Sequence, residues 1–75
     1  MNIKVEIDSV KSLIISNDDE LNLVRLKYFS KDGILPKIYK LSSESKGSKS
    51  IQYLNALVEI RRIVDSKISD FILSH

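Results

Sequence analysis

The chain has 75 residues, enough for one small domain, and no cysteine, which excludes disulfides and thiolate metal sites. No apolar run approaches the ~20 residues that a transmembrane helix needs. The net charge is only +2, but residues 24–50 hold seven Lys or Arg against two acids, whereas residues 1–20 hold two Lys against five acids.

The first segments of the chain are typical of β-structure. Apolar and charged residues alternate over residues 3–8, which predicts a half-buried strand. Residues 11–16 have a β-branched apolar centre and predict a second short strand, although a short helical turn fits residues 9–14 as well. The polar residues 17–20 then predict a turn or loop.

Residues 21–29 and 34–41 predict a β-hairpin closed by a three-residue loop at 31–33. In such a loop Gly33 takes the left-handed conformation. A two-residue loop would mix apolar and charged residues on both faces, whereas this register makes one face almost wholly apolar. Pro36 cannot donate a ladder hydrogen bond, which predicts a strand at the edge of the sheet. The apolar face comprises Val24, Leu26, Tyr28, Ile34, Pro36 and Ile38.

Residues 42–49 predict a flexible polar linker, and residues 50–74 predict a long helix without Gly or Pro, which Ser48 or Ser50 can cap. The apolar arc of this helix spans about 220°, more than a two-stranded hairpin can cover. We therefore expect a partner protein on the remaining apolar surface. The expected partner interface comprises Tyr53, Leu57, Ile60, Ile63, Val64, Ile68 and Phe71.

We expect no enzymatic activity, no metal and no cofactor. His75 is the only histidine and the last residue, where a chain frays. Asp18, Asp19 and Glu20 are consecutive, and three consecutive carboxylates on regular structure do not all face one ion. With two glycines in the whole chain, no glycine-rich phosphate loop is present.

The basic middle third raises a second hypothesis, in which the hairpin binds nucleic acid. The possible nucleic-acid contacts are Lys27, Lys31, Lys37 and Lys40. Phe29 and Tyr39 share the basic face of the predicted hairpin and could stack on bases, whereas Tyr28 is on its apolar face. No nucleic-acid-binding motif is complete, so we expect direct binding to be weak or indirect.

The order of the predicted parts resembles a known family. A hairpin with Tyr28 and Asp32-Gly33 precedes Gly47-Ser48, and the helix then carries Tyr53-Leu54, Leu57, Ile68 and Asp70-Phe71-Ile72. Over residues 21–74 this order resembles the Gon-seven type of accessory subunit of the KEOPS/EKC complex. The first twenty residues have no counterpart in that family.

The resemblance implies a non-catalytic structural subunit. Such a subunit pairs with a Pcc-type subunit through its hairpin edge and its apolar helix face, and it folds on binding. The complex makes the threonylcarbamoyl modification of the adenosine beside the anticodon in tRNA, and a separate subunit carries the catalysis. A homodimer through the same surface is the other expected assembly.

We therefore expect a single α+β domain over residues 1–75. An antiparallel sheet of two to four strands occupies residues 1–41, a linker follows at 42–49, and one helix over 50–74 lies across the sheet. The N-terminus lacks the pattern of a secretory signal, which predicts an intracellular protein of the cytoplasm or nucleus, without a membrane segment. The alternative is a small, self-associating basic ββα module that binds nucleic acid.

Overall fold

The computed structural model describes residues 2–74, and this part of the chain forms four α-helices and no strand. The helices are α1 (Ile3–Lys11), α2 (Asp18–Phe29), α3 (Ile34–Glu44) and α4 (Ser48–Ser74). The expected α+β fold, with a β-hairpin sheet within residues 1–41, is therefore wrong. The fold is all-helical.

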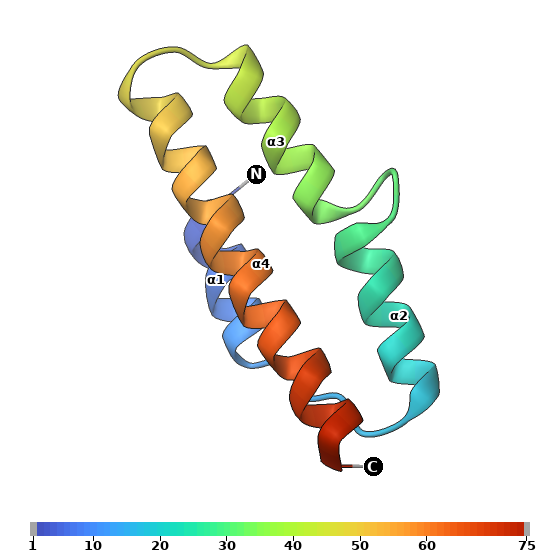
Figure 1. The fold of residues 1–75 in the computed structure, drawn as a ribbon. Coiled ribbons are helices and arrows are strands. Elements are labelled where there is room, and N and C mark those ends of the chain that lie inside the picture. Colours follow the sequence, from blue (N-terminus) through green and yellow to red (C-terminus); the bar gives the residue numbers. More distant parts are fainter. Residues whose placement is uncertain (1, 75) are drawn as a thin grey trace.

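Helix α4 is the spine of an elongated molecule that measures 43 × 20 × 17 Å. Its 27 residues span about 40 Å at 1.5 Å per residue, so this one helix runs almost the length of the molecule. Helices α3 and α1 both pack against α4, and α2 packs against α3. In Figure 1, α3 runs beside the first half of α4, α2 continues towards the C-terminal end, and α1 runs alongside the middle of α4, partly hidden behind it.

Helix α1 forms in place of the first expected strand because its inward residues follow a helical spacing. Ile3, Ile7 and Val10 are three or four residues apart; Val10 is fully buried and the other two are half-buried. Val5, which the alternation placed beside Ile3 and Ile7, is 54% exposed. Asn2 caps the helix, because its Oδ1 accepts a 3.2 Å hydrogen bond from the Val5 N–H.

Helix α2 forms in place of the expected polar turn and the first hairpin strand. The Asn17 Oδ1 accepts a 2.8 Å hydrogen bond from the Glu20 N–H, and the Glu20 Oε1 accepts one of 2.8 Å from the Ser16 N–H. This reciprocal pair resembles a capping box and satisfies donors at the start of the helix. The buried residues of α2 are Leu21, Val24 and Tyr28. The second expected strand, over residues 11–16, is mostly the connection between α1 and α2.

Helix α3 forms in place of the second hairpin strand, and the turn before it is not a hairpin loop. Gly33 is the N-cap of α3 with φ −75°, so the expected left-handed conformation is wrong there. Pro36 is the third residue of the helix, where a missing N–H is tolerated because the first N–H groups have no partner within a helix. Leu35 and Ile38 are buried, and their spacing places them on one side of α3.

The long C-terminal helix is present, and the connection before it is shorter than expected. Helix α3 continues to Glu44, so residues 45–47 rather than 42–49 connect it to α4. Gly47, with φ 65°, is the only residue of the described chain with a positive φ. The Ser50 hydroxyl lies within α4 and donates a 2.9 Å hydrogen bond to the Ser42 carbonyl oxygen, which ties the end of α3 to the start of α4.

The core lies where the three shorter helices meet the middle of α4. Its buried cluster is Val10, Val24, Tyr28, Leu35, Ile38, Ile60 and Val64. All four helices contribute to it, so the described chain is one domain. Lys67 on α4 adds a polar link, because its Nζ donates to the carbonyl oxygens of Lys11 (2.9 Å) and Leu13 (2.7 Å). A cation here stabilises the C-terminal end of α1, whose last carbonyl groups have no partner within the helix.

Candidate binding surfaces beside α3

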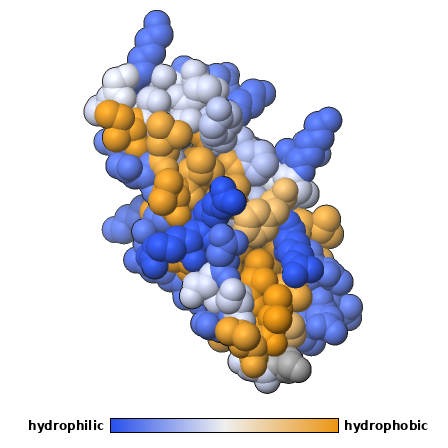
Figure 2. Space-filling view, viewed as in Figure 1, coloured by the Kyte–Doolittle hydropathy of each residue, from blue (hydrophilic) through white to orange (hydrophobic). Residues whose placement is uncertain are grey.

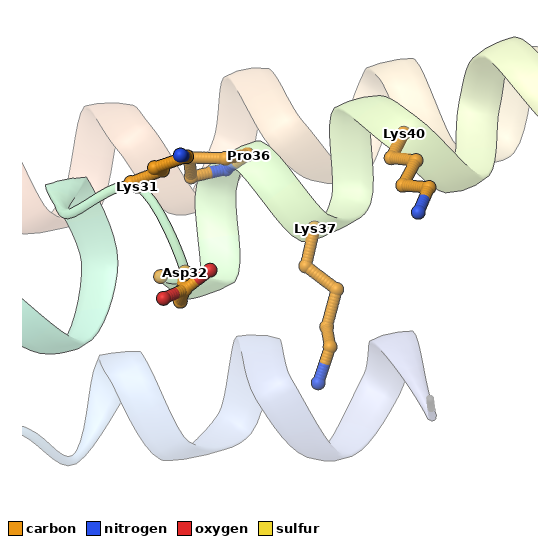
Figure 3. Close-up of a pocket in the computed structure, with 6 residues that line it drawn as sticks. Lys31, Asp32, Pro36, Lys37 and Lys40 are labelled. Atoms are coloured by element: carbon orange, nitrogen blue, oxygen red, sulfur yellow. The ribbon is translucent and has the colours of Figure 1, made fainter.

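Three of the four lysines expected to contact nucleic acid gather at the start of α3. They line a hollow of about 330 Å³, which we call the basic hollow. Its lining residues are Lys31, Asp32, Gly33, Pro36, Lys37 and Lys40. In Figure 3 the side chains of Lys37 and Lys40 extend from α3 on the same side, and Lys31 lines the same hollow from the turn before α3.

The basic hollow is electropositive because its lysines have no anionic partner within residues 2–74. Asp32 is the only acid that lines it, and none of its three lysines forms an ion pair with a residue between 2 and 74. The start of α3 adds to the potential, because the N-terminal end of a helix carries a partial positive charge. Gly33 provides no side-chain cap that would reduce this charge.

Lys27 does not belong to the basic hollow. Its Nζ lies 5.5 Å from the centroid of the Tyr28 ring, and its side chain lines a separate hollow with Ile14 and Leu23. The expected hairpin would have placed Lys27 on the same face as Lys37. On the helices it belongs to the end of α2, so the four lysines do not form one continuous site.

A second hollow, of about 370 Å³, lies beside the first, between α3 and α4, and we call it the apolar hollow. Its lining residues are Phe29, Leu35, Pro36, Tyr39, Leu57 and Arg61. Phe29 and Tyr39, which the hairpin placed on one face, do come together here, and they are 40% and 61% exposed. Pro36 lines both hollows, so the two are direct neighbours.

Exposed apolar residues of α4 continue the apolar hollow along the helix. Leu54 and Val58 are 41% and 66% exposed, and each precedes a lining residue of the hollow, Leu57 or Arg61, by three positions. Residues three apart lie on the same side of a helix. We call the apolar hollow together with Leu54 and Val58 the α3–α4 face. Figure 2 shows hydrophobic side chains gathered over the first half of α4, and hydrophilic side chains separate them from a second zone near its end.

Most residues of the expected partner interface are used inside the molecule instead. Ile60 and Val64 have no exposed surface, and Phe71 is 7% exposed. The half-buried ones are Tyr53, Leu57, Ile63 and Ile68, which pack against the core. Of all seven residues, only Leu57 lines the apolar hollow.

The burial of these expected interface residues is caused by the position of α1. Lys67, four residues after Ile63 on the same side of α4, bonds the end of α1. Helix α1 therefore covers the flank of α4 that carries Ile60 and Ile63, and the flank with Val58 and Arg61 stays open. The apolar pattern of α4 already contained Leu54 and Val58, but the position of α1 was needed to choose between the two flanks.

Tyr28 is a titratable residue that lies in the core. Burial raises the pKa of its phenol, and the Glu6 carboxylate raises it further. The side chain is fully buried, and its hydroxyl has no hydrogen-bond partner within residues 2–74. Because the core encloses this group, it cannot reach a substrate, and we assign it no catalytic role.

Tyr28→Phe is expected to raise the free energy of unfolding by about 1 kcal/mol, because it removes a buried hydroxyl that lacks a partner. A second effect concerns alkaline pH. In the folded chain the Tyr28 phenol keeps its proton at pH values above its ordinary pKa of about 10, whereas in the unfolded chain it loses it. Unfolding therefore releases a proton at these pH values, and the free energy of unfolding falls as the pH rises above about 10. Tyr28→Phe has no such phenol and lacks this part of the alkaline loss of stability. Urea unfolding between pH 7 and 11 measures both effects.

Tyr39→Phe is the matched control, because Tyr39 is 61% exposed. We expect this substitution to change the free energy of unfolding at pH 7 by less than about 0.5 kcal/mol. A Tyr28→Phe protein that is less stable than the parent at pH 7 would show that the hydroxyl is hydrogen-bonded in solution.

Other chemistry is sparse in the described chain. Asp18, Asp19 and Glu20 form the first turn of α2, where carboxylates are favoured by the helix dipole. No group of three or more His, Asp or Glu side chains within residues 2–74 could hold a metal ion. His75 lies outside the described residues. None of the helices between residues 2 and 74 is both long enough and apolar enough to cross a bilayer.

Comparison with protein-family models finds no family that matches the chain. No curated protein matches it, and neither does a solved structure. The resemblance to Gon-seven-type subunits therefore stays a prediction.

Proposed function

We propose that this chain is a non-catalytic protein-binding module that docks a partner on the α3–α4 face. The observation that supports this most is the exposure of Phe29, Tyr39, Leu54 and Val58, between 40% and 66%, around one apolar hollow. Apolar side chains that are exposed singly are ordinary, whereas a contiguous group of them is typical of an interaction site.

Burial of the α3–α4 face would stabilise a complex through the hydrophobic effect. Full burial of one Val, Leu or Phe side chain contributes about 1.5–3 kcal/mol. Aromatic residues and Arg are the commonest anchors of protein interfaces. Arg61 is available for such a contact, because its 3.9 Å pair with Asp65 joins two exposed side chains and holds them weakly.

The identity of the partner is a separate question. The resemblance noted in the sequence suggests a Pcc-type subunit of a tRNA-modifying complex, and we retain this subunit as the first candidate to test. Docking through a hairpin edge is excluded, because residues 2–74 contain no strand. Such a partner would have to pack on helices. A second copy of this chain is the other candidate for the same surface.

Direct nucleic-acid binding is the second candidate function, and the basic hollow favours it. Its three unpaired lysines could contact phosphates, and contacts of this kind weaken steeply with salt. Three lysines make few contacts, however, and Lys27 lies apart from them. We expect the isolated chain to bind nucleic acid weakly.

The test uses two Asp substitutions on different faces. Val58→Asp lies on the α3–α4 face and Val5→Asp on α1, and the two valines are 66% and 54% exposed. Each should change the free energy of unfolding by about 0.5 kcal/mol or less. Tagged parent and variant proteins are used to capture partners from an extract of the source cells, and quantitative mass spectrometry compares the captured proteins. Sizing with light scattering measures self-association.

We expect the parent and Val5→Asp to capture the same partner, and Val58→Asp to lose it. The physical reason is that a carboxylate in an apolar interface gives up its hydration without compensation. If the partner is a second copy, the same difference appears as a dimer that only Val58→Asp dissociates. Equal capture by all three proteins, without a dimer, would place the docking surface elsewhere.

A further inference from the structure

The basic hollow and the apolar hollow form one continuous surface, because both include Pro36. On α3, Lys37 and Lys40 line the basic hollow on one side of Pro36, and Leu35 and Tyr39 line the apolar hollow on the other. A partner element seated in the apolar hollow would therefore have cations along one of its edges.

The charge of this surface is strongly one-sided. Its cations are Lys31, Lys37, Lys40 and Arg61, and its one acid is Asp32. The three lysines have no ion pair within the described chain, and the pair of Arg61 with Asp65 is long and exposed. A neutral or basic partner on this surface would cover these cations without pairing them, which costs free energy.

We infer that the α3–α4 face receives an acidic amphipathic helix, whose apolar side chains enter the apolar hollow and whose carboxylates face the basic hollow and Arg61. This inference rests on the proposed function and names the chemistry of the partner. A helix suits the surface because apolar anchors three or four residues apart lie on one side, and acids can occupy the adjacent side. Opposite charges also steer the encounter and raise the association rate.

The apolar half of the surface is the reason to prefer a peptide over a nucleic acid. Surfaces that bind single strands combine cations along the backbone with aromatic platforms for the bases. Here Leu35, Pro36 and Leu57 line the apolar hollow together with the two aromatic rings, so much of its wall is aliphatic. Leucine-type side chains of a peptide would be buried against this surface, whereas a sugar-phosphate backbone would only be desolvated by it.

Selection from a display library of helical peptides tests the inference. The library is selected on the parent, on Lys37→Glu/Lys40→Glu, and on Lys46→Glu/Lys49→Glu. Both double variants change the net charge equally, and Lys46 and Lys49 are exposed and line neither hollow. Circular dichroism establishes that each protein is folded. We expect the parent and the control variant to enrich peptides with net negative charge and apolar residues at helical spacing.

The best peptide is then synthesised, and fluorescence anisotropy measures its Kd for all three proteins, with a labelled single-stranded RNA of about 20 nucleotides as the nucleic-acid probe. The Kd for the peptide should be at least about tenfold higher for Lys37→Glu/Lys40→Glu than for the other two, and it should rise with salt.

Enrichment of neutral or basic peptides, no enrichment, or equal Kd values would overturn the inference. Tighter binding of the RNA than of the peptide, lost in Lys37→Glu/Lys40→Glu, would overturn it in favour of nucleic acid. In each of these cases the proposed function still stands if Val58→Asp loses the captured partner, so the two failures are distinguishable.

Discussion

Replacement of Ile60 by Asp is expected to unfold this protein. The Ile60 side chain has no exposed surface and belongs to a core cluster built from all four helices. Asp at this position removes the apolar contacts and buries a carboxylate among apolar side chains, a loss of at least about 4 kcal/mol. A chain of this length has a free energy of unfolding of only about 4–11 kcal/mol, so a loss of this size removes at least about a third of it and, at the lower end of the range, all of it. Circular dichroism during thermal and urea unfolding measures the change.

Val58→Asp is the matched control, two residues away on the same helix. Val58 is 66% exposed, so we expect this variant to unfold with the same midpoint as the parent within a few degrees. On the expected hairpin fold, Asp at Ile60 or Ile63 would have removed association and left the fold intact. A cooperative, parent-like transition of Ile60→Asp would therefore show that α1 does not close this flank of α4.

Gly33→Ala is expected to lower the free energy of unfolding by about 1–3 kcal/mol. A Cβ atom at Gly33 would lie 2.9 Å from the Ser30 carbonyl oxygen, 3.0 Å from the Lys27 carbonyl oxygen and 3.0 Å from the Tyr28 carbonyl carbon. These atoms belong to the backbone and cannot rotate away as a flexible side chain would. The turn between α2 and α3, whose residues line the basic hollow, would have to open. Urea unfolding at constant pH measures the loss.

Gly47 distinguishes this steric cause from a preference for the left-handed conformation. Gly47 has φ 65°, and an added Cβ atom there meets nothing within 4 Å. Asn tolerates the left-handed region, so Gly47→Asn should be nearly neutral. Gly33→Asn should lose about as much as Gly33→Ala, although Asn is a good N-cap, because the clash involves Cβ itself. A neutral Gly33→Asn would show that the turn has room for a side chain.

The strands predicted within residues 1–41 were wrong because the local sequence signals there are common to strands and helices. A short alternation such as that around Val5 also contains the i, i+4 pair Ile3 and Ile7, and over one or two turns the two periods are hard to tell apart. Pro36 is compatible with an edge strand and equally with the first turn of a helix. One local signal did favour the helices: Asn17 followed three residues later by Glu20 is a capping pattern, and both side chains are used in this way.

The sequence by itself determined helix α4 and its excess of apolar surface, because a helical period repeated over many turns without Gly or Pro allows no other structure. It also determined the basic middle third. Only the tertiary structure decided which apolar residues are exposed and which lysines meet. An apolar arc that covers more than half of a helix can be covered by another element from either flank. Which flank is covered depends on where α1 packs. That position rests on contacts between residues more than fifty positions apart, such as Lys67 with Lys11 and Leu13. For the same reason Val58 faces solvent while Ile60 lies in the core, although both belong to one apolar pattern.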